Sequence, residues 1–230
     1  MNFGLSLQRK RNLRVLRWLL TLLAILLVFI ASWFTYQWYT TGNQPPVVSL
    51  PAAALANPSV DETPVTKKQI DEHTVPANHP RYISIPALGV KKVRVISVGL
   101  TNTREIDTPM NISDTAWYDK SATPGQGYGV VVINGHNGGI TRDGIFANLN
   151  QLQEGDEIIV ERGDGEVFTY TVVENKTESL QQANKTGMKR LFTPYNPTEE
   201  GLGLITCSGN WVPKDKVFDQ RILVRATISQ

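Results

Sequence analysis

The stretch Gly203-Leu204-Ile205-Thr206-Cys207-Ser208-Gly209 contains the only cysteine of the 230-residue chain. Its apolar residues predict a buried strand that opens into a loop after the cysteine. A lone cysteine in this position has two interpretations: an inert, small buried hydrophobe, or a nucleophile at the rim of a sheet. The inert interpretation is the default, so the rest of the chain has to decide between them.

Charge and hydropathy are distributed unevenly along the chain. It carries 23 basic and 21 acidic residues, a formal net charge of +2, so the composition does not indicate a nucleic-acid-binding surface. No acidic residue precedes Asp61, and an uncharged run of seventeen residues extends from Trp18 to Phe34. With Thr35 and Tyr36 added, this run reaches the usual length of a membrane-spanning helix, about 17–25 residues. Basic residues cluster just before it: Arg9, Lys10, Arg11, Arg14 and Arg17.

The positive-inside rule gives this N-terminal region an orientation. It predicts that residues 1–17 are cytoplasmic, that 18–40 form a transmembrane signal anchor, and that the remainder is extracellular. A cleaved signal peptide is the alternative, since Ala54-Leu55-Ala56 fits a small-x-small cleavage site, although it lies far beyond the apolar run. Either alternative exports the C-terminal part. An exported chain with one cysteine cannot form an intramolecular disulfide, which draws attention to Cys207 as a candidate for an intermolecular disulfide or a reactive thiol.

Residues 41–78 are predicted to be an extended, mobile linker, because few large apolar residues are available for burial. Six prolines interrupt any regular pattern: Pro45, Pro46, Pro51, Pro58, Pro64 and Pro76. A spacer of this kind outside a membrane anchor would hold a catalytic domain, residues 79–230, away from the lipid.

From residue 79 the sequence is typical of short strands separated by turns, which predicts a mainly β fold, a closed or nearly closed β-barrel. The Asp-Gly pair in Arg162–Gly165 is a strong hairpin signal. Strands are predicted over 82–85, 93–98, 130–133, 157–161, 167–173, 202–206 and 222–228. Short helices are predicted over 103–106, 145–149 and 185–191.

A catalytic thiol needs a partner that removes its proton or stabilises the thiolate, and imidazole is the usual one. The predicted domain contains two histidines. His79 lies at its edge beside a proline, which favours a structural or solvated role. His136 follows the buried run Val130–Ile133 between glycines, which suits a turn that presents an imidazole at the rim of a sheet. We therefore pair His136 with Cys207.

Acyl transfer also needs a donor for the oxyanion, and the last predicted strand supplies two arginines. Its alternation predicts that Ile222, Val224, Ala226 and Ile228 face the core. Arg221 and Arg225 then share the opposite face. Each has the alternative of being a solvated surface charge. Arg221 is the nearer of the two to Cys207 in the sequence.

These residues together resemble the sortases, membrane-anchored cysteine transpeptidases of bacterial surfaces. The resemblance covers residues 79–230 in order, through Leu204–Cys207, Gly135-His136 and Arg221. Two further segments resemble the family's first strand and its middle region, residues 83–90 and 146–158. The similarity implies an eight-stranded sortase-type β-barrel with a few short helices, preceded by one transmembrane helix.

Carried over residue by residue, the resemblance implies that Cys207 is the nucleophile, His136 the general acid/base and Arg221 the oxyanion-stabilising and substrate-positioning residue; Arg225 has no matching role. It implies cleavage of an LPxTG-like sorting signal through a thioester. The acyl group would pass to an amine of a cell-wall precursor, such as lipid II or peptidoglycan, or to a pilin lysine. The expected partners are surface proteins or pilins with C-terminal sorting signals. No cofactor, metal site or nucleic-acid partner is expected.

Two departures from the family pattern flank the nucleophile. Gly203 stands where well-known sortases have a threonine, and Ser208–Trp211 matches no pattern that we can assign. The compact, N-terminally anchored form resembles classes A, D, E and F, with class F preferred. An exported cysteine peptidase that hydrolyses its acyl-enzyme remains an alternative, as does a non-catalytic membrane-tethered binding module.

Overall fold

A computed structural model describes residues 3–46 and 60–229 as two units, an N-terminal helix and a barrel. Helix α1 extends over Phe3–Thr41. Its segment Leu13–Thr41 is long and apolar enough to cross a membrane, and an 18-residue window within it has a mean hydropathy of 2.4. This agrees with the predicted span. The possible cleavage site at 54–56 lies outside the described residues.

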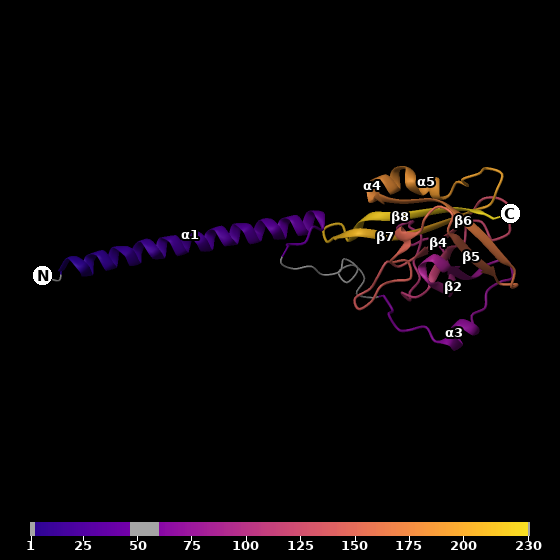
Figure 1. Cartoon of the computed structure of the whole chain (residues 1–230), viewed down its shortest axis with the longest axis horizontal. Helices are drawn as coiled ribbons and strands as arrows, with labels where there is room; N and C mark the ends of the chain where they lie inside the picture. Colours follow the sequence, from indigo (N-terminus) through magenta and orange to yellow (C-terminus); the bar gives the residue numbers. More distant parts are fainter. Residues whose placement is uncertain (1–2, 47–59, 230) are drawn as a thin grey trace. The chain divides into compact units, whose positions relative to one another are not determined.

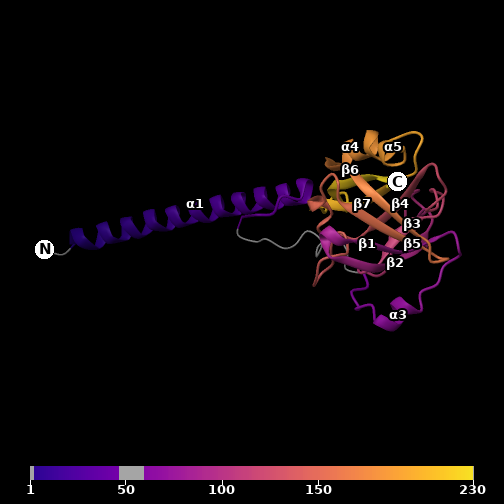
Figure 2. The same ribbon diagram turned by 45° about the vertical axis from the view of Figure 1, so that its right-hand side comes forward.

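Eight strands close into a barrel in the order β1-β2-β3-β4-β7-β8-β6-β5 (Figures 1 and 2). The β2–β3 and β4–β7 pairs are parallel, whereas β1–β2, β1–β5, β3–β4, β5–β6 and β6–β8 are antiparallel. The strands are β1 Pro80–Ile85, β2 Val90–Val98, β3 Thr115–Tyr118, β4 Val130–Gly135, β5 Glu157–Arg162, β6 Val167–Ser179, β7 Gly201–Val212 and β8 Val217–Ile228. The mainly β, eight-stranded barrel predicted from the sequence is confirmed.

Side-chain alternation divides each strand between the barrel interior and its outer surface. Val131 and Ile133 of β4 and Leu202 and Leu204 of β7 lie in the main core. From β8, Ile222, Val224 and Ala226 join the same core, as the alternation predicted.

A second apolar cluster lies on the outer face of the barrel. It contains Val130 and Val132 of β4, Leu223 of β8, and Ala183 and Leu191 from the segment between β6 and β7. That segment comprises α4 Leu180–Gln182, the π-helix η3 Ala183–Gly187 and α5 Met188–Leu191. In Figures 1 and 2 it lies on the opposite side of the barrel from α3, Lys67–Asp71.

Every predicted strand falls within an observed one, but other expectations need correction. Strand β7 does not open into a loop after Cys207; it continues to Val212, with Gly209 at φ +80° in its second half. Strand β3 was not predicted, because four residues are too few to show an alternating pattern.

Two of the predicted helices are absent. Residues 103–106 form a turn instead, in which the Thr101 hydroxyl accepts a hydrogen bond from the Glu105 N–H at 3.2 Å. Short polar side chains of this kind compete with helical hydrogen bonds. Residues 145–149 form turns that lead into the 3₁₀-helix η2, Leu149–Gln151. The predicted helix at 185–191 corresponds to η3 and α5, and another 3₁₀-helix, η1, covers Pro86–Leu88.

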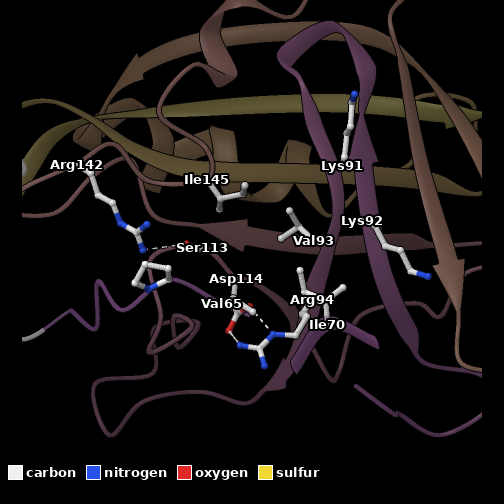
Figure 3. A pocket seen from close by; sticks show the side chains of 11 residues that line it. Val65, Ile70, Lys91, Lys92, Val93, Arg94, Ser113, Asp114, Arg142 and Ile145 are labelled. Atoms are coloured by element: carbon white, nitrogen blue, oxygen red, sulfur yellow. Dashed lines mark hydrogen bonds and ion pairs between the residues drawn. The ribbon is translucent and has the colours of Figure 1, made fainter. Parts of the chain in front are cut away.

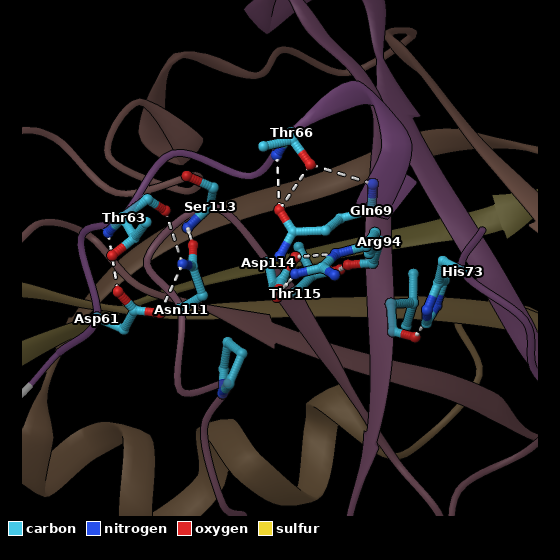
Figure 4. A network of polar contacts seen from close by, with 12 residues as sticks. Asp61, Thr63, Thr66, Gln69, His73, Arg94, Asn111, Ser113, Asp114 and Thr115 are labelled. Carbon is cyan, nitrogen blue, oxygen red and sulfur yellow. Dashed lines mark hydrogen bonds and ion pairs between the residues drawn. The ribbon is translucent and has the colours of Figure 1, made fainter. Parts of the chain in front are cut away.

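Residues 60–73, which we call the N-terminal strap, pack on the barrel rather than remaining extended and mobile. Thr66 caps α3 through a reciprocal pair of hydrogen bonds with Gln69, drawn in Figure 4. The Ile70 carbonyl accepts a hydrogen bond from the Tyr82 hydroxyl, and His73 Nε2 donates to the Val95 carbonyl at 3.1 Å. The part of the predicted linker from residue 60 therefore contributes to the folded unit.

Candidate active site

The three predicted catalytic residues share the outer face of three adjacent strands. In β4 the odd-numbered residues 131 and 133 face the core, and the even-numbered Val130 and Val132 face outward. His136 is one residue beyond the end of β4, and the same alternation places it on the outer face. In β7 the even-numbered residues face the core, and Cys207 is in phase with the outward Ile205. In β8, Arg221 is in phase with the outward Leu223. The barrel order β4-β7-β8 makes these strands neighbours.

The pairing of β4 with β7 brings His136 and Cys207 to the same level of the sheet. Asn134 lies opposite Ile205 in the parallel register, and His136 and Cys207 each follow two residues later. The Thr206 hydroxyl donates to the Gly135 carbonyl at 2.8 Å, which links the strands directly beside both residues. Neighbouring strands lie about 4.8 Å apart, so the two side chains come from adjacent backbones.

Arg221 and Arg225 have different surroundings. Arg221 is close enough to Cys207 for its positive charge to lower the pKa of the thiol, and its Nη1 donates to the Phe218 and Gln220 carbonyls at 3.1 and 2.8 Å. Arg225 donates to the Thr193 carbonyl at 3.0 Å, and its guanidinium lies 5.2 Å from the centre of a tyrosine ring. Arg221 is thus the arginine whose charge reaches the thiol, while Arg225 holds the segment after α5.

The imidazole of His136 is buried and has one hydrogen-bond partner among the described residues. Its Nε2–H donates to the Pro109 carbonyl at 2.6 Å, which leaves Nδ1 of the neutral ring as a proton acceptor. Burial lowers the pKa of His136, and the hydrogen bond to Pro109 opposes that shift. The His136 carbonyl accepts from the Phe146 N–H at 2.9 Å, and a Cβ added at Gly144 would lie 2.2 Å from the same oxygen. The loop after His136 is therefore folded tightly against it.

Cys207 is a free cysteine, and its side chain is half-buried. Burial raises the pKa of Cys207 above its usual value; Arg221 opposes this shift, and the Glu105 carboxylate adds to it. A raised thiol pKa beside a lowered imidazole pKa means that thiol and imidazole are both mainly neutral. A thiolate–imidazolium pair is then a minor form, which a bound substrate would have to stabilise.

Half-buried apolar side chains lie on the same outer face of the barrel as the thiol. Half-buried Ile106, Tyr118, Met188 and Ile205 pack against the outer cluster. The ring of Tyr118 meets that of Phe192 edge-on at 5.9 Å. These side chains would suit the apolar residues of an extended peptide.

Gly203 lies on this outer face, two strand positions before Ile205. A Cβ built at Gly203 would lie 2.9 Å from Leu191 Cδ1 and 3.1 Å from the Leu191 carbonyl oxygen. Helix α5 therefore packs directly on the strand backbone, which explains why glycine occupies a position where the family pattern has threonine.

The N-terminal strap contacts both loops that surround His136. Asp61 pairs with Asn111 in a parallel β-bridge. The Asp61 N–H donates to the Met110 carbonyl at 3.0 Å, and the Asp61 carbonyl accepts from the Ile112 N–H at 2.9 Å. These residues directly follow Pro109, the partner of His136. Figure 4 shows that the Asn111 side chain also donates to the Asp61 carboxylate. The strap thus supports the segment that holds the imidazole.

The neighbouring loop, residues 137–144, is held by Glu62. Its carboxylate accepts hydrogen bonds from the N–H groups of Ile140 and Thr141 and from the Thr141 hydroxyl. Between the strap and β2 lies a cavity of about 220 Å³, in which Arg94 forms a bidentate ion pair with Asp114 and Arg142 donates to Ser113 (Figure 3).

The three candidate side chains predicted from the sequence lie on one face of the barrel, but the residues that hold them were not predicted. Nothing in the sequence marks the Pro109 carbonyl or the Thr206 hydroxyl as supports of the site. The alternation of the strand does indicate that Thr206 and Cys207 face opposite sides of the sheet. Asp61 and Glu62, the first acidic residues of the chain, fell within the predicted linker. In the described parts of the chain, no group of three or more His, Cys, Asp and Glu side chains is arranged to hold a metal ion.

Comparison with known proteins identifies the family. Residues 83–229, more than half of the chain, match the model of the sortase domain. No curated protein sequence matches the chain significantly.

Solved structures share the fold. Sortase A from Corynebacterium diphtheriae is 23% identical with a TM-score of 0.51, covering 80% of this chain and 78% of its own. Sortase C-1 from Actinomyces oris is 20% identical with a TM-score of 0.50, covering 80% of this chain and 91% of its own. Together with the match of the family model, these findings establish that the chain belongs to the sortase family of cysteine transpeptidases.

Proposed function

We propose that this sortase cleaves an LPxTG-like sorting signal through a thioester on Cys207 and transfers the acyl group to an amine. The observation that carries the proposal is the common outer face of β4, β7 and β8, from which His136, Cys207 and Arg221 project on the same side of the barrel as half-buried apolar side chains. An extended peptide with an apolar N-terminal part and a scissile carbonyl over the thiol fits this arrangement.

In the first half-reaction, the Cys207 thiolate attacks the carbonyl carbon of the substrate threonine. The negative charge that develops on the carbonyl oxygen is stabilised by the Arg221 guanidinium, which exchanges a neutral backbone carbonyl for the substrate. The carbon–nitrogen bond breaks as the His136 imidazolium gives its proton to the leaving glycine amine. The products are a thioester on Cys207 and a free C-terminal fragment.

In the second half-reaction, the acceptor amine attacks the thioester carbonyl. His136 takes the proton that the amine loses, an amide bond forms, and the Cys207 thiolate leaves. The proposed acceptors are amines of lipid II, peptidoglycan or a pilin lysine, and the proposed acyl donors are surface proteins or pilins with C-terminal sorting signals.

The basic residues before the apolar helix support an N-terminus in the cytoplasm and a catalytic domain outside the cell. Proteolysis of intact cells tests this orientation. An external protease should remove the barrel while leaving the N-terminal segment; protection of the barrel would contradict the orientation.

The reaction itself is tested with the full chain in detergent and an LPxTG-type peptide, with and without an added amine. Mass spectrometry should detect the amine-linked product with wild type, and none with Cys207→Ala or His136→Ala. Hydrolysed peptide alone in both conditions would favour an exported cysteine peptidase. A Cys207 that resists thiol reagents until the protein is denatured would favour a non-catalytic binding module.

A further inference from the structure

Two acidic side chains of β6 face the two arginines of β8. In the antiparallel register, Glu178 lies opposite Arg221 and Glu174 lies opposite Arg225. Directly opposed residues have Cβ atoms about 4.5–5.5 Å apart, so each carboxylate is within reach of the guanidinium across from it. The proposed catalytic arginine therefore has a carboxylate as its cross-strand neighbour.

Arg190 of α5 binds both carboxylates at once. Its Nε donates to Glu174 Oε1 and its Nη2 donates to Glu178 Oε1, each at 2.7 Å. The side chains are largely buried, with exposed fractions of 24% for Arg190, 14% for Glu174 and 12% for Glu178. Arg190 thus reaches from the segment between β6 and β7 to the β6 strand that precedes it.

The two carboxylates differ in how many cations they contact. Glu174 also contacts Lys176 at 3.1 Å and Arg225 at 3.7 Å. Glu178 forms a salt bridge to Arg190 alone among the described residues, and its second carboxylate oxygen is buried without a hydrogen-bond partner. Arg190 is therefore the cation that compensates the Glu178 carboxylate.

Arg221 is not paired with Glu178 in this arrangement. Its guanidinium donates to the carbonyls of Phe218 and Gln220, which are neutral acceptors and easily exchanged for a substrate carbonyl. A buried carboxylate that loses its only cation is strongly destabilised unless another cation takes its place. Arg221 is the cation that the strand register places opposite it.

We propose that Arg190 is a positioning residue for catalysis: by neutralising Glu178, it keeps the Arg221 guanidinium out of a cross-strand ion pair and available to the substrate carbonyl. The proposal rests on the proposed role of Arg221. It also links that role to the segment between β6 and β7, because displacement of α5 would withdraw Arg190 from Glu178 and allow Glu178 to bind Arg221.

The test compares Arg190→Met, Glu178→Gln and the double variant in the full chain, using cleavage of an LPxTG-type peptide. Methionine keeps much of the side-chain volume of arginine but removes the charge. A charged hydrogen bond that diverts Arg221 should lower kcat/KM of Arg190→Met by roughly 10- to 100-fold. Glu178→Gln should have near wild-type activity, and Arg190→Lys should retain most of it.

The double variant Arg190→Met/Glu178→Gln distinguishes a role of Arg190 in positioning Arg221 from a role in holding α5 against the barrel. With the carboxylate removed, Arg221 is free again, so kcat/KM should return to within about threefold of Glu178→Gln. The alkylation pKa of Cys207 should rise in Arg190→Met and fall back in the double variant. No restoration, or no loss in Arg190→Met, would overturn the proposal.

Arg221→Ala, measured in the same assay, separates this inference from the proposed function. Full activity in Arg221→Ala would refute the role of Arg221 itself. An inactive Arg221→Ala together with an unrestored double variant would refute only the role of Arg190.

Discussion

The close contact between Gly203 of β7 and α5 predicts that a single methyl group added at Gly203 will destabilise the barrel. In Gly203→Ala the new Cβ would lie 2.9 Å from Leu191 Cδ1, 3.0 Å from Leu191 Cγ and 3.1 Å from the Leu191 carbonyl oxygen. Contacts this short force the helix away from the strand. Overpacking of this kind costs about 1–3 kcal/mol, and the loss of glycine entropy in the unfolded chain offsets about 0.4–1 kcal/mol of it.

With the middle of each range, the net loss of unfolding free energy is about 1.3 kcal/mol. For a folded unit of this size, each kcal/mol lowers the melting temperature by about 2–4 °C, so Gly203→Ala should melt about 3–5 °C below wild type. The assay is thermal unfolding of the full chain in detergent, followed by near-ultraviolet circular dichroism. Gly203→Thr, which restores the family's residue, should be destabilised further.

Gly99→Ala provides the matched control, because a Cβ added at Gly99 would have no heavy atom within 4 Å. It should melt at the wild-type temperature or slightly above. Equal melting temperatures for Gly203→Ala and Gly99→Ala would refute the argument that α5 packs on the strand backbone. The double variant Leu191→Ala/Gly203→Ala should lose less stability than the sum of its single changes, since the smaller side chain removes part of the clash.

Three further predictions concern charge and proton transfer. A kcat/KM profile against pH should be bell-shaped, because activity requires that Cys207 and His136 together hold one proton. The acid limb should lie below pH 6.5, because the pKa of His136 is lowered. The alkaline limb should lie above pH 9.0, because the pKa of Cys207 is raised. An alkaline limb below 9.0 would contradict this. Arg221→Ala should shift the iodoacetamide alkylation curve of Cys207 to higher pH, since Arg221 lowers the thiol pKa; an unchanged curve would place the guanidinium elsewhere. Glu200→Ala should lower the unfolding free energy, measured by chemical denaturation, by about 2–4 kcal/mol. The reason is that the buried Glu200 carboxylate accepts hydrogen bonds from two backbone N–H groups and the Tyr170 hydroxyl. Glu200→Gln should lose less stability, and equal losses in the two variants would argue against a hydrogen-bonding role.

The sequence predicted the barrel well because most strands carry their own signal. The apolar run Val130–Ile133 and the alternating pattern of β8 indicate which residues are buried. The Asp-Gly pair between β5 and β6 indicates a hairpin turn. Strand β3 is only four residues long, and long loops separate it from β2 and β4, the two strands with which it pairs. Its existence is a property of the closed sheet rather than of its own residues.

The candidate side chains could also be proposed from the sequence, since a lone thiol, an imidazole between glycines and an arginine on an alternating strand are distinctive residue types. Their supports were not. The partner of His136 is a backbone carbonyl, which every residue possesses, so Pro109 carries no signal. Asp61 and Glu62 lie in proline-containing sequence that lacks an apolar pattern, and they are ordered by hydrogen bonds to loops about 50 and 80 residues away. Arg190 is visible only once β6, α5 and β8 are assembled.

The central claim is that Cys207 forms a thioester which an amine resolves. The most direct measurement is intact-protein mass spectrometry of the full chain after brief mixing with an LPxTG-type peptide, followed by addition of an amine acceptor. The account predicts a mass increase equal to the acyl fragment, located on Cys207, labile to hydroxylamine and discharged by the amine into a new amide product. Cleaved peptide without any adduct on Cys207, or an adduct that persists in Cys207→Ala, would contradict it.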